Sequence, residues 1–102
     1  MKTINTKQVL LNLKGEDLKE ADGQPALLGK YLCNVMAGRV SNPFLGWTLG
    51  KKFATEETVD LSAEEIVFIK EEVKRVSIPG GETVWMNAVA AGQILEILDK
   101  KD

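Results

Sequence analysis

The chain contains one thiol and no imidazole, so the thiol is its only candidate of these two types for nucleophilic catalysis. Cys33 is the single cysteine, and histidine is absent. A catalytic thiolate needs a base, a cation or a helix N-terminus that lowers its pKa. The sequence places Cys33 late in an expected helix, beside Leu32 and Met36, where the helix dipole opposes a thiolate. We therefore interpret Cys33 as a buried small hydrophobic residue.

Carboxylates gather between residues 60 and 72. The string Asp60-x-Ser62-x-Glu64-Glu65 carries oxygen ligands, but a calcium loop of the EF-hand type needs twelve residues and a glycine at its sharp turn. Glu71 and Glu72 follow two helical turns after Glu64 and Glu65, without the histidines of metal sites in helical bundles. We expect helix capping and solvated helix faces, with lysines interleaved, instead of a metal site.

The glycines do not supply a phosphate site either, because they fit neither the dinucleotide fingerprint nor the phosphate loop. No pair of base and nucleophile can be drawn from the sequence. The chain is therefore expected not to be an enzyme and to need no cofactor and no metal.

Two tryptophans are the side chains best suited to binding a partner. Trp47 and Trp85 belong to a residue type that is enriched at the energetic centres of protein interfaces. Packing in the core, with the indole N–H satisfied, is the first interpretation of both, and an interface is the alternative. The candidate interface residues are Trp47, Trp85, Ala88, Ala91, Gly92 and Leu95.

Composition and charge limit the classes of partner. The 102 residues include 13 basic and 15 acidic residues, so the net charge is −2. The basic residues are scattered, whereas a nucleic-acid surface needs several cations on one face. No apolar run, including Ala88–Ala91, is longer than four residues, which predicts no membrane span and no signal-peptide core. The chain is large enough for one core, so residues 1–102 are expected to form one small globular domain. A lone cysteine without a secretion signal favours the cytoplasm.

The elements that would position these residues begin with β structure. Val9–Leu13 is rich in strand-compatible residues, and Gly15 marks a turn that predicts a short hairpin. A second turn contains Asp22-Gly23-Gln24-Pro25. Thr58–Leu61 is expected to be an extended connector.

Helices follow this β structure. Pro25 at a first turn predicts a helix over Ala26–Ala37, with Leu28, Leu32, Val35 and Met36 on one face. Asn42-Pro43 predicts the cap and first residue of the next helix, in which Gly46 and Gly50 form a smooth strip for close packing. Ser62 and Glu65 form a capping box ahead of a stripe with Ile66, Ile69, Val73 and Val76. The expected fold is therefore α+β and mainly helical, with a short N-terminal β-hairpin packed on three to four helices.

The final helix, expected from about Glu82 to Leu98, has apolar residues over more than one stripe. A helix of this kind should be covered on two sides. A second copy of the chain could cover one of them, and two-fold dimers are the commonest oligomers. The alternative is that the rest of the same chain buries this helix.

The order of these signals resembles a class of small uncharacterised proteins of tailed phages and prophages. The residues that carry the likeness are the Gly15 hairpin, the Asp22–Pro25 turn, Leu45-Gly46-Trp47 and the Val59–Glu65 cap. The resemblance implies a non-enzymatic accessory protein that acts in the bacterial host cell through protein–protein contacts. Binding a host or defence protein and assisting virion assembly are both compatible with it. A self-associating structural subunit and a protein that sequesters a small ligand are the alternatives.

Overall fold

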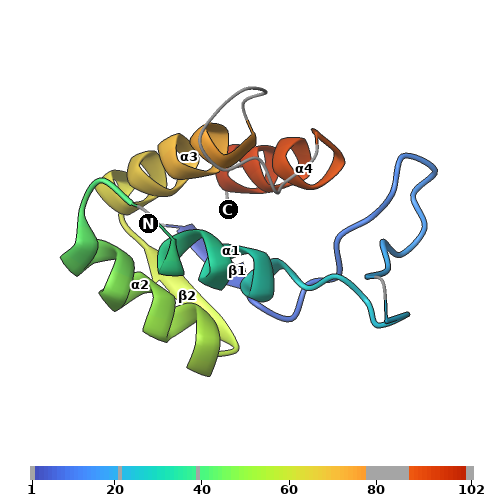
Figure 1. Cartoon of the computed structure of the whole chain (residues 1–102), viewed down its shortest axis with the longest axis horizontal. Helices are drawn as coiled ribbons and strands as arrows, with labels where there is room; N and C mark the ends of the chain where they lie inside the picture. Colours follow the sequence, from blue (N-terminus) through green and yellow to red (C-terminus); the bar gives the residue numbers. More distant parts are fainter. Residues whose placement is uncertain (1, 21, 39, 78–87, 101–102) are drawn as a thin grey trace.

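The computed structural model describes residues 2–20, 22–38, 40–77 and 88–100. Within them the chain forms the strands β1 (Lys2–Asn5) and β2 (Thr58–Leu61) and the helices α1 (Leu28–Ala37), α2 (Pro43–Thr55), α3 (Ala63–Ser77) and α4 (Ala88–Asp99). Helix α1 packs on α2 and α3 packs on α4, and α1 also contacts α3. Figure 1 shows α3 and α4 together above α1, α2 and the two strands, with the segment between β1 and α1 projecting to one side. The α+β, mainly helical fold is confirmed.

The regular strand pair joins two distant segments of the chain. β1 and β2 run antiparallel, with Ile4 opposite Val59 and Lys2 opposite Leu61. Ile4, Val59 and Leu61 are buried, because alternate side chains of a strand share one face. The segment expected to be a connector at Thr58–Leu61 is therefore the second strand.

The hairpin expected around Gly15 is present as a ladder of single bridges. Leu11 pairs with Asp17 and Lys19 pairs with Pro25, both antiparallel. The two turns place Gly15 at φ 83° and Gly23 at φ 85°, a left-handed conformation that glycine adopts without steric cost.

Backbone carbonyls of the N-terminal segment cap helix α1. The Gly29 N–H donates to Thr6 O and the Leu28 N–H donates to Gln8 O, both at 2.8 Å, whereas the cap residue Leu27 offers no side-chain hydrogen bond. These contacts satisfy N–H groups that lack partners inside a helix. The predicted start at Ala26 is wrong by two residues, because the helix begins at Leu28 and Pro25 belongs to the bridge with Lys19.

The caps and stripes expected for α2 and α3 are confirmed. The Leu45 N–H donates to Asn42 Oδ1 at 3.1 Å, with Pro43 as the first helical residue. The Glu65 N–H donates to Ser62 Oγ at 3.2 Å, and the Ser62 N–H donates to Glu65 Oε1 at 2.8 Å. The stripe is buried at its centre and half-buried at Ile66. The smooth strip on α2 packs on α1, because a Cβ at Gly46 would lie 3.1 Å from Met36 O and 2.7 Å from Val40 Cγ2.

Helix α4 is the last described element. Its buried residues Ala90, Ala91, Ile94 and Leu98 join the core formed by the other helices and strands. Lys70 of α3 forms an ion pair with Asp99 of α4. The expected start of this helix near Glu82 and the loop Ile78-Pro79-Gly80-Gly81 lie outside the described residues.

We expect Gly29→Ala to destabilise the fold, although alanine normally favours a helix over glycine by about 1 kcal/mol. A Cβ at Gly29 would lie 2.5 Å from Thr6 Cβ, so the helix or the strand end would have to move. Overpacking of this kind costs about 1–3 kcal/mol. The matched control is Gly92→Ala in α4, where nothing lies within 4 Å of the new Cβ, and this variant should gain up to about 1 kcal/mol. Urea denaturation measures both, and equal shifts in the same direction would contradict the tight contact.

We expect Ser62→Ala to lower the free energy of unfolding by about 0.5–2 kcal/mol, because the Glu65 N–H loses its acceptor. Glu65→Ala should cost less in the Ser62→Ala background than in the wild type, since the two hydrogen bonds of the capping box form together. The midpoint of urea denaturation of the two single variants and the double variant gives the comparison. Strictly additive changes would show that the box does not act as a unit.

Candidate interaction surface

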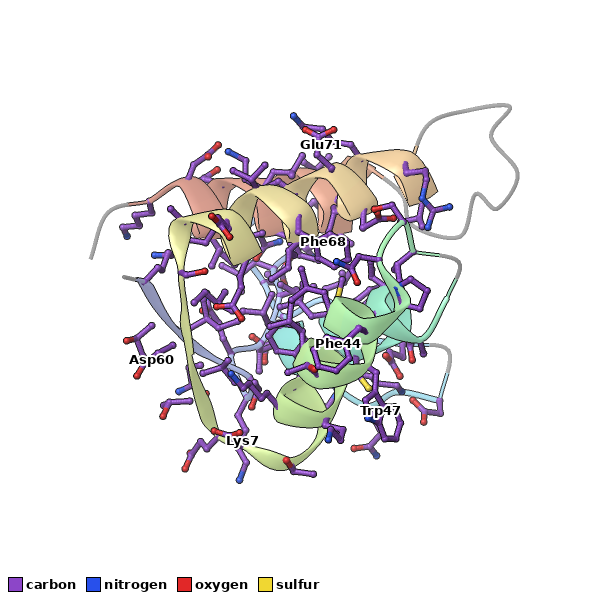
Figure 2. All side chains as sticks on the ribbon, turned by 90° about the vertical axis from the view of Figure 1, so that its left-hand side faces the viewer. Lys7, Phe44, Trp47, Asp60, Phe68 and Glu71 are labelled. Atoms are coloured by element: carbon purple, nitrogen blue, oxygen red, sulfur yellow. The ribbon has the colours of Figure 1, made fainter. Side chains whose placement is uncertain are left out.

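Two large aromatic side chains project from helix α2 into solvent. Phe44 is 78% exposed and Trp47 is 65% exposed, and residues three apart lie on the same side of a helix. Figure 2 shows both on α2, with Phe68 between α2 and α3 and Glu71 pointing outward from α3. Core packing, the first interpretation of Trp47, is wrong. Leu49 and Phe53 face the core instead.

An apolar groove of about 240 Å³ lies beside Trp47, between α1 and α2. It is lined by Cys33, Met36 and Ala37 of α1 and by Gly46, Trp47, Gly50, Lys51 and Ala54 of α2. A second hollow of about 440 Å³ shares Cys33 and Ala54 with it and extends toward Glu56 and Glu57. Trp47 therefore stands at the edge of a longer depression along the α1–α2 seam, and Phe44 lies one turn before it on α2.

Lys51 contributes the positive charge at this groove. Its Nζ lies 5.0 Å from the centroid of the Trp47 ring, which is a cation–π arrangement. No carboxylate among the described residues forms an ion pair with Lys51. Residues 23–55, which include all of α1 and α2, contain four basic residues and no acidic residue. The other nine of the 13 basic residues share the rest of the chain with all 15 acidic residues.

A buried carboxylate fixes the loop that leads into α2. Glu72 of α3 is only 3% exposed, so the expectation that it lies on a solvated face is wrong. Its Oε1 accepts hydrogen bonds from Ser41 N at 3.2 Å and Ser41 Oγ at 2.9 Å, and its Oε2 accepts one from Arg75 Nε at 2.8 Å. Ser41 immediately precedes the cap residue Asn42. Glu72 therefore holds the start of the helix that presents Phe44 and Trp47.

The electrostatics of Glu72 keep it ionised. Burial by itself would raise the pKa of Glu72, but the hydrogen bonds from Arg75 and Ser41 and the charge of Arg75 lower this pKa below its ordinary value. Hydrogen bonds and an opposite charge that favour the ionised form outweigh desolvation here. Arg75 lies three residues after Glu72, so the sequence alone indicates that the two are neighbours on a helix. Ser41 lies 31 residues away, and only the fold brings it to Glu72.

Among the described candidate interface residues, Ala91, Gly92 and Leu95 belong to α4 and not to the α1–α2 groove. Ala91 is buried in the core, Leu95 is half-buried against it, and Gly92 is exposed on α4. Ala88 begins α4, and Trp85 lies outside the described residues. Within the described part of α4, the same chain buries Ala90, Ala91, Ile94 and Leu98, and the dimer stays a prediction.

Cys33 packs against the core as a small hydrophobic residue, but it is half-buried and not buried as expected, and it lines both hollows. In the part of the chain that the structure describes, no group of three cysteine, histidine or acidic side chains could hold a metal ion. Among the same residues no helix has the length and apolar character needed to cross a membrane.

No family model, no curated protein and no solved structure matches the chain.

Phe44 was not among the residues singled out from the sequence. Its spacing to Trp47, together with the absence of acidic residues from 23–55, could have identified it.

We expect the protein to lose stability in acid through Glu72. A carboxyl whose pKa is lower in the folded state stabilises the fold fully above its unfolded pKa, about 4.3 for glutamate, and this contribution is lost as the pH falls through the folded value. Glu72→Gln should be less stable than the wild type at pH 7, and the difference should shrink between pH 5 and about pH 3. Urea denaturation across this range measures it. The exposed Glu64→Gln is the control, and a difference independent of pH would contradict the assignment.

Proposed function

We propose that the protein is a non-enzymatic binding module that contacts a protein partner through Phe44, Trp47 and the groove between α1 and α2. The observation that carries the proposal is the exposure of two aromatic side chains on one side of α2 beside an apolar hollow. Tryptophan in such a position is typical of the few residues that supply most of the binding energy of an interface. Covering a large apolar side chain contributes about 1.5–3 kcal/mol.

The way in which the surface is held supports this proposal. α2 is capped by Asn42 and tied to α3 through Ser41 and Glu72, and it packs closely on α1 at Gly46. A surface built on fixed helices loses little conformational entropy when a partner binds. The phage or prophage accessory role in a bacterial cytoplasm, implied by the sequence resemblance, stays a prediction, as does the dimer.

We expect Trp47→Ala to weaken partner binding by about thirtyfold or more, since the removal of a central aromatic residue costs about 2 kcal/mol or more. Leu13→Ala is the matched control, because Leu13 is 91% exposed and lies in the Gly15 turn, away from α2. The partner is first captured from a bacterial lysate, and the purified complex is then measured by isothermal titration calorimetry with each variant.

Both substitutions change exposed side chains, so thermal melting should show folded variants. A partner that binds Trp47→Ala and Leu13→Ala equally would contradict the proposed surface. Light scattering in the same samples tests the dimer: a mass near 11.2 kDa at all concentrations would contradict self-association.

A further inference from the structure

We propose that the segment that fills the α1–α2 groove is an amphipathic helix of a partner protein, with a carboxylate that pairs with Lys51. This inference rests on the proposed function and adds the chemistry of the partner. It follows from two properties of the groove: the backbone groups around it and the charge at its edge.

The backbone around the groove favours a helical occupant. The groove lies between α1 and α2, whose backbone N–H and C=O groups are bonded within each helix. An extended peptide would bring its own N–H and C=O groups into an apolar hollow that offers them no strand edge, and unpaired buried polar groups are costly. A helix satisfies its backbone internally and presents apolar side chains at positions i, i+3, i+4 and i+7.

The small side chains along the groove suit the same occupant. Ala37 of α1 and Gly50 and Ala54 of α2 line it without large side chains, so the surface of an incoming helix could approach closely. Trp47 stands at the edge of this floor and would pack against the side of the incoming helix.

The charge at the groove requires an acidic group on the occupant. The ammonium group of Lys51 lies over the Trp47 ring, so a partner that covers the ring also removes water from Lys51. A cation that loses water without a partner destabilises a complex, whereas a carboxylate placed within reach offsets this cost. The chain itself supplies no carboxylate there, because residues 23–55 contain none, and Glu56 and Glu57 line the neighbouring hollow.

A protein helix fits this groove better than a polyanion. Among the described residues that line the groove, Lys51 is the one cation, whereas phosphate backbones are held by several cations that act together. Lys7 and Lys30 line the neighbouring hollow, but Glu56 and Glu57 line it too and Lys30 already pairs with Glu20. The net charge of −2 also disfavours a long polyanion. Helices that bind anionic lipid carry several cations beside their apolar face, whereas Lys51 is the one cation among the described residues that line this groove.

The test is a selection from a displayed library of helical peptides, run in parallel on the wild type, Lys51→Glu, Lys51→Met and Trp47→Ala. Wild-type binders should carry apolar residues at helical spacing and Asp or Glu at one fixed position. They should bind Lys51→Glu about tenfold more weakly, with Lys51→Met in between, and lose affinity as salt is raised. Lys51→Glu should select Lys or Arg at the same position. Lys51 is exposed, so melting curves should show that all variants fold.

The outcomes separate this inference from the proposed function. Peptides that depend on Trp47 but carry no acidic preference, or the same peptides on wild type and Lys51→Glu, would overturn the inference and leave the proposed surface standing. Failure to find any peptide that depends on Trp47 would overturn both. Binding of a fluorescein-labelled oligothymidylate or of phosphatidylglycerol vesicles that is lost in Trp47→Ala would also overturn it. So would a doubling of mass in light scattering that Trp47→Ala abolishes, because the occupant would then be a second copy.

Discussion

The close contact between Thr6 and Gly29 is the constraint on which the rest of this structure depends. Thr6 is 7% exposed, and its hydroxyl is shared between the carbonyl oxygens of Glu56 at 2.7 Å and Glu57 at 3.0 Å. Its own carbonyl accepts from the Gly29 N–H. One residue thus joins the end of β1, the start of α1 and the junction between α2 and β2. The absence of a side chain at Gly29 permits this approach, which ties the start of α1 to the segment that follows α2.

Local signals in the sequence predicted most of the helical structure. The capping box at Ser62 and the Asn42-Pro43 start are confirmed because their hydrogen bonds join residues three apart. The start of α1 was misplaced because its cap comes from carbonyls of Thr6 and Gln8, about twenty residues earlier, and no side chain marks it. The pairing of β1 with β2 was missed for the same reason. Only the folded chain brings Ile4 opposite Val59, and four-residue strands carry a weak periodic signal.

The sequence predicted which residue type would form the candidate site, but not that the Trp47 side chain would be exposed. Trp47 was singled out as a binding side chain, but its hydrophobicity favoured the core. Leu49 and Phe53 of α2 are buried and Leu45 packs against the same core, whereas Trp47 lies on another side of the helix and is exposed. Glu72 shows the reverse error, because glutamate is usually solvated, and its burial depends on Ser41, which the chain order hides. Both errors concern which side of a helix the rest of the fold covers.

The same small residues explain both the packing of α1 on α2 and the hollow beside Trp47. Gly46 lets the two helices approach because Met36 and Val40 occupy the space of a missing side chain. One turn later, a Cβ at Gly50 would lie 3.4 Å from Met36 Cβ, an ordinary contact, so glycine is not needed there for the helices to pack. A larger side chain at Gly50 would instead shorten the groove, which this residue lines. Stability thus depends on the first glycine, and the open floor of the groove depends on the second. If close packing of α1 on α2 were the only requirement, position 50 could carry a larger side chain, which would cover part of the Trp47 ring.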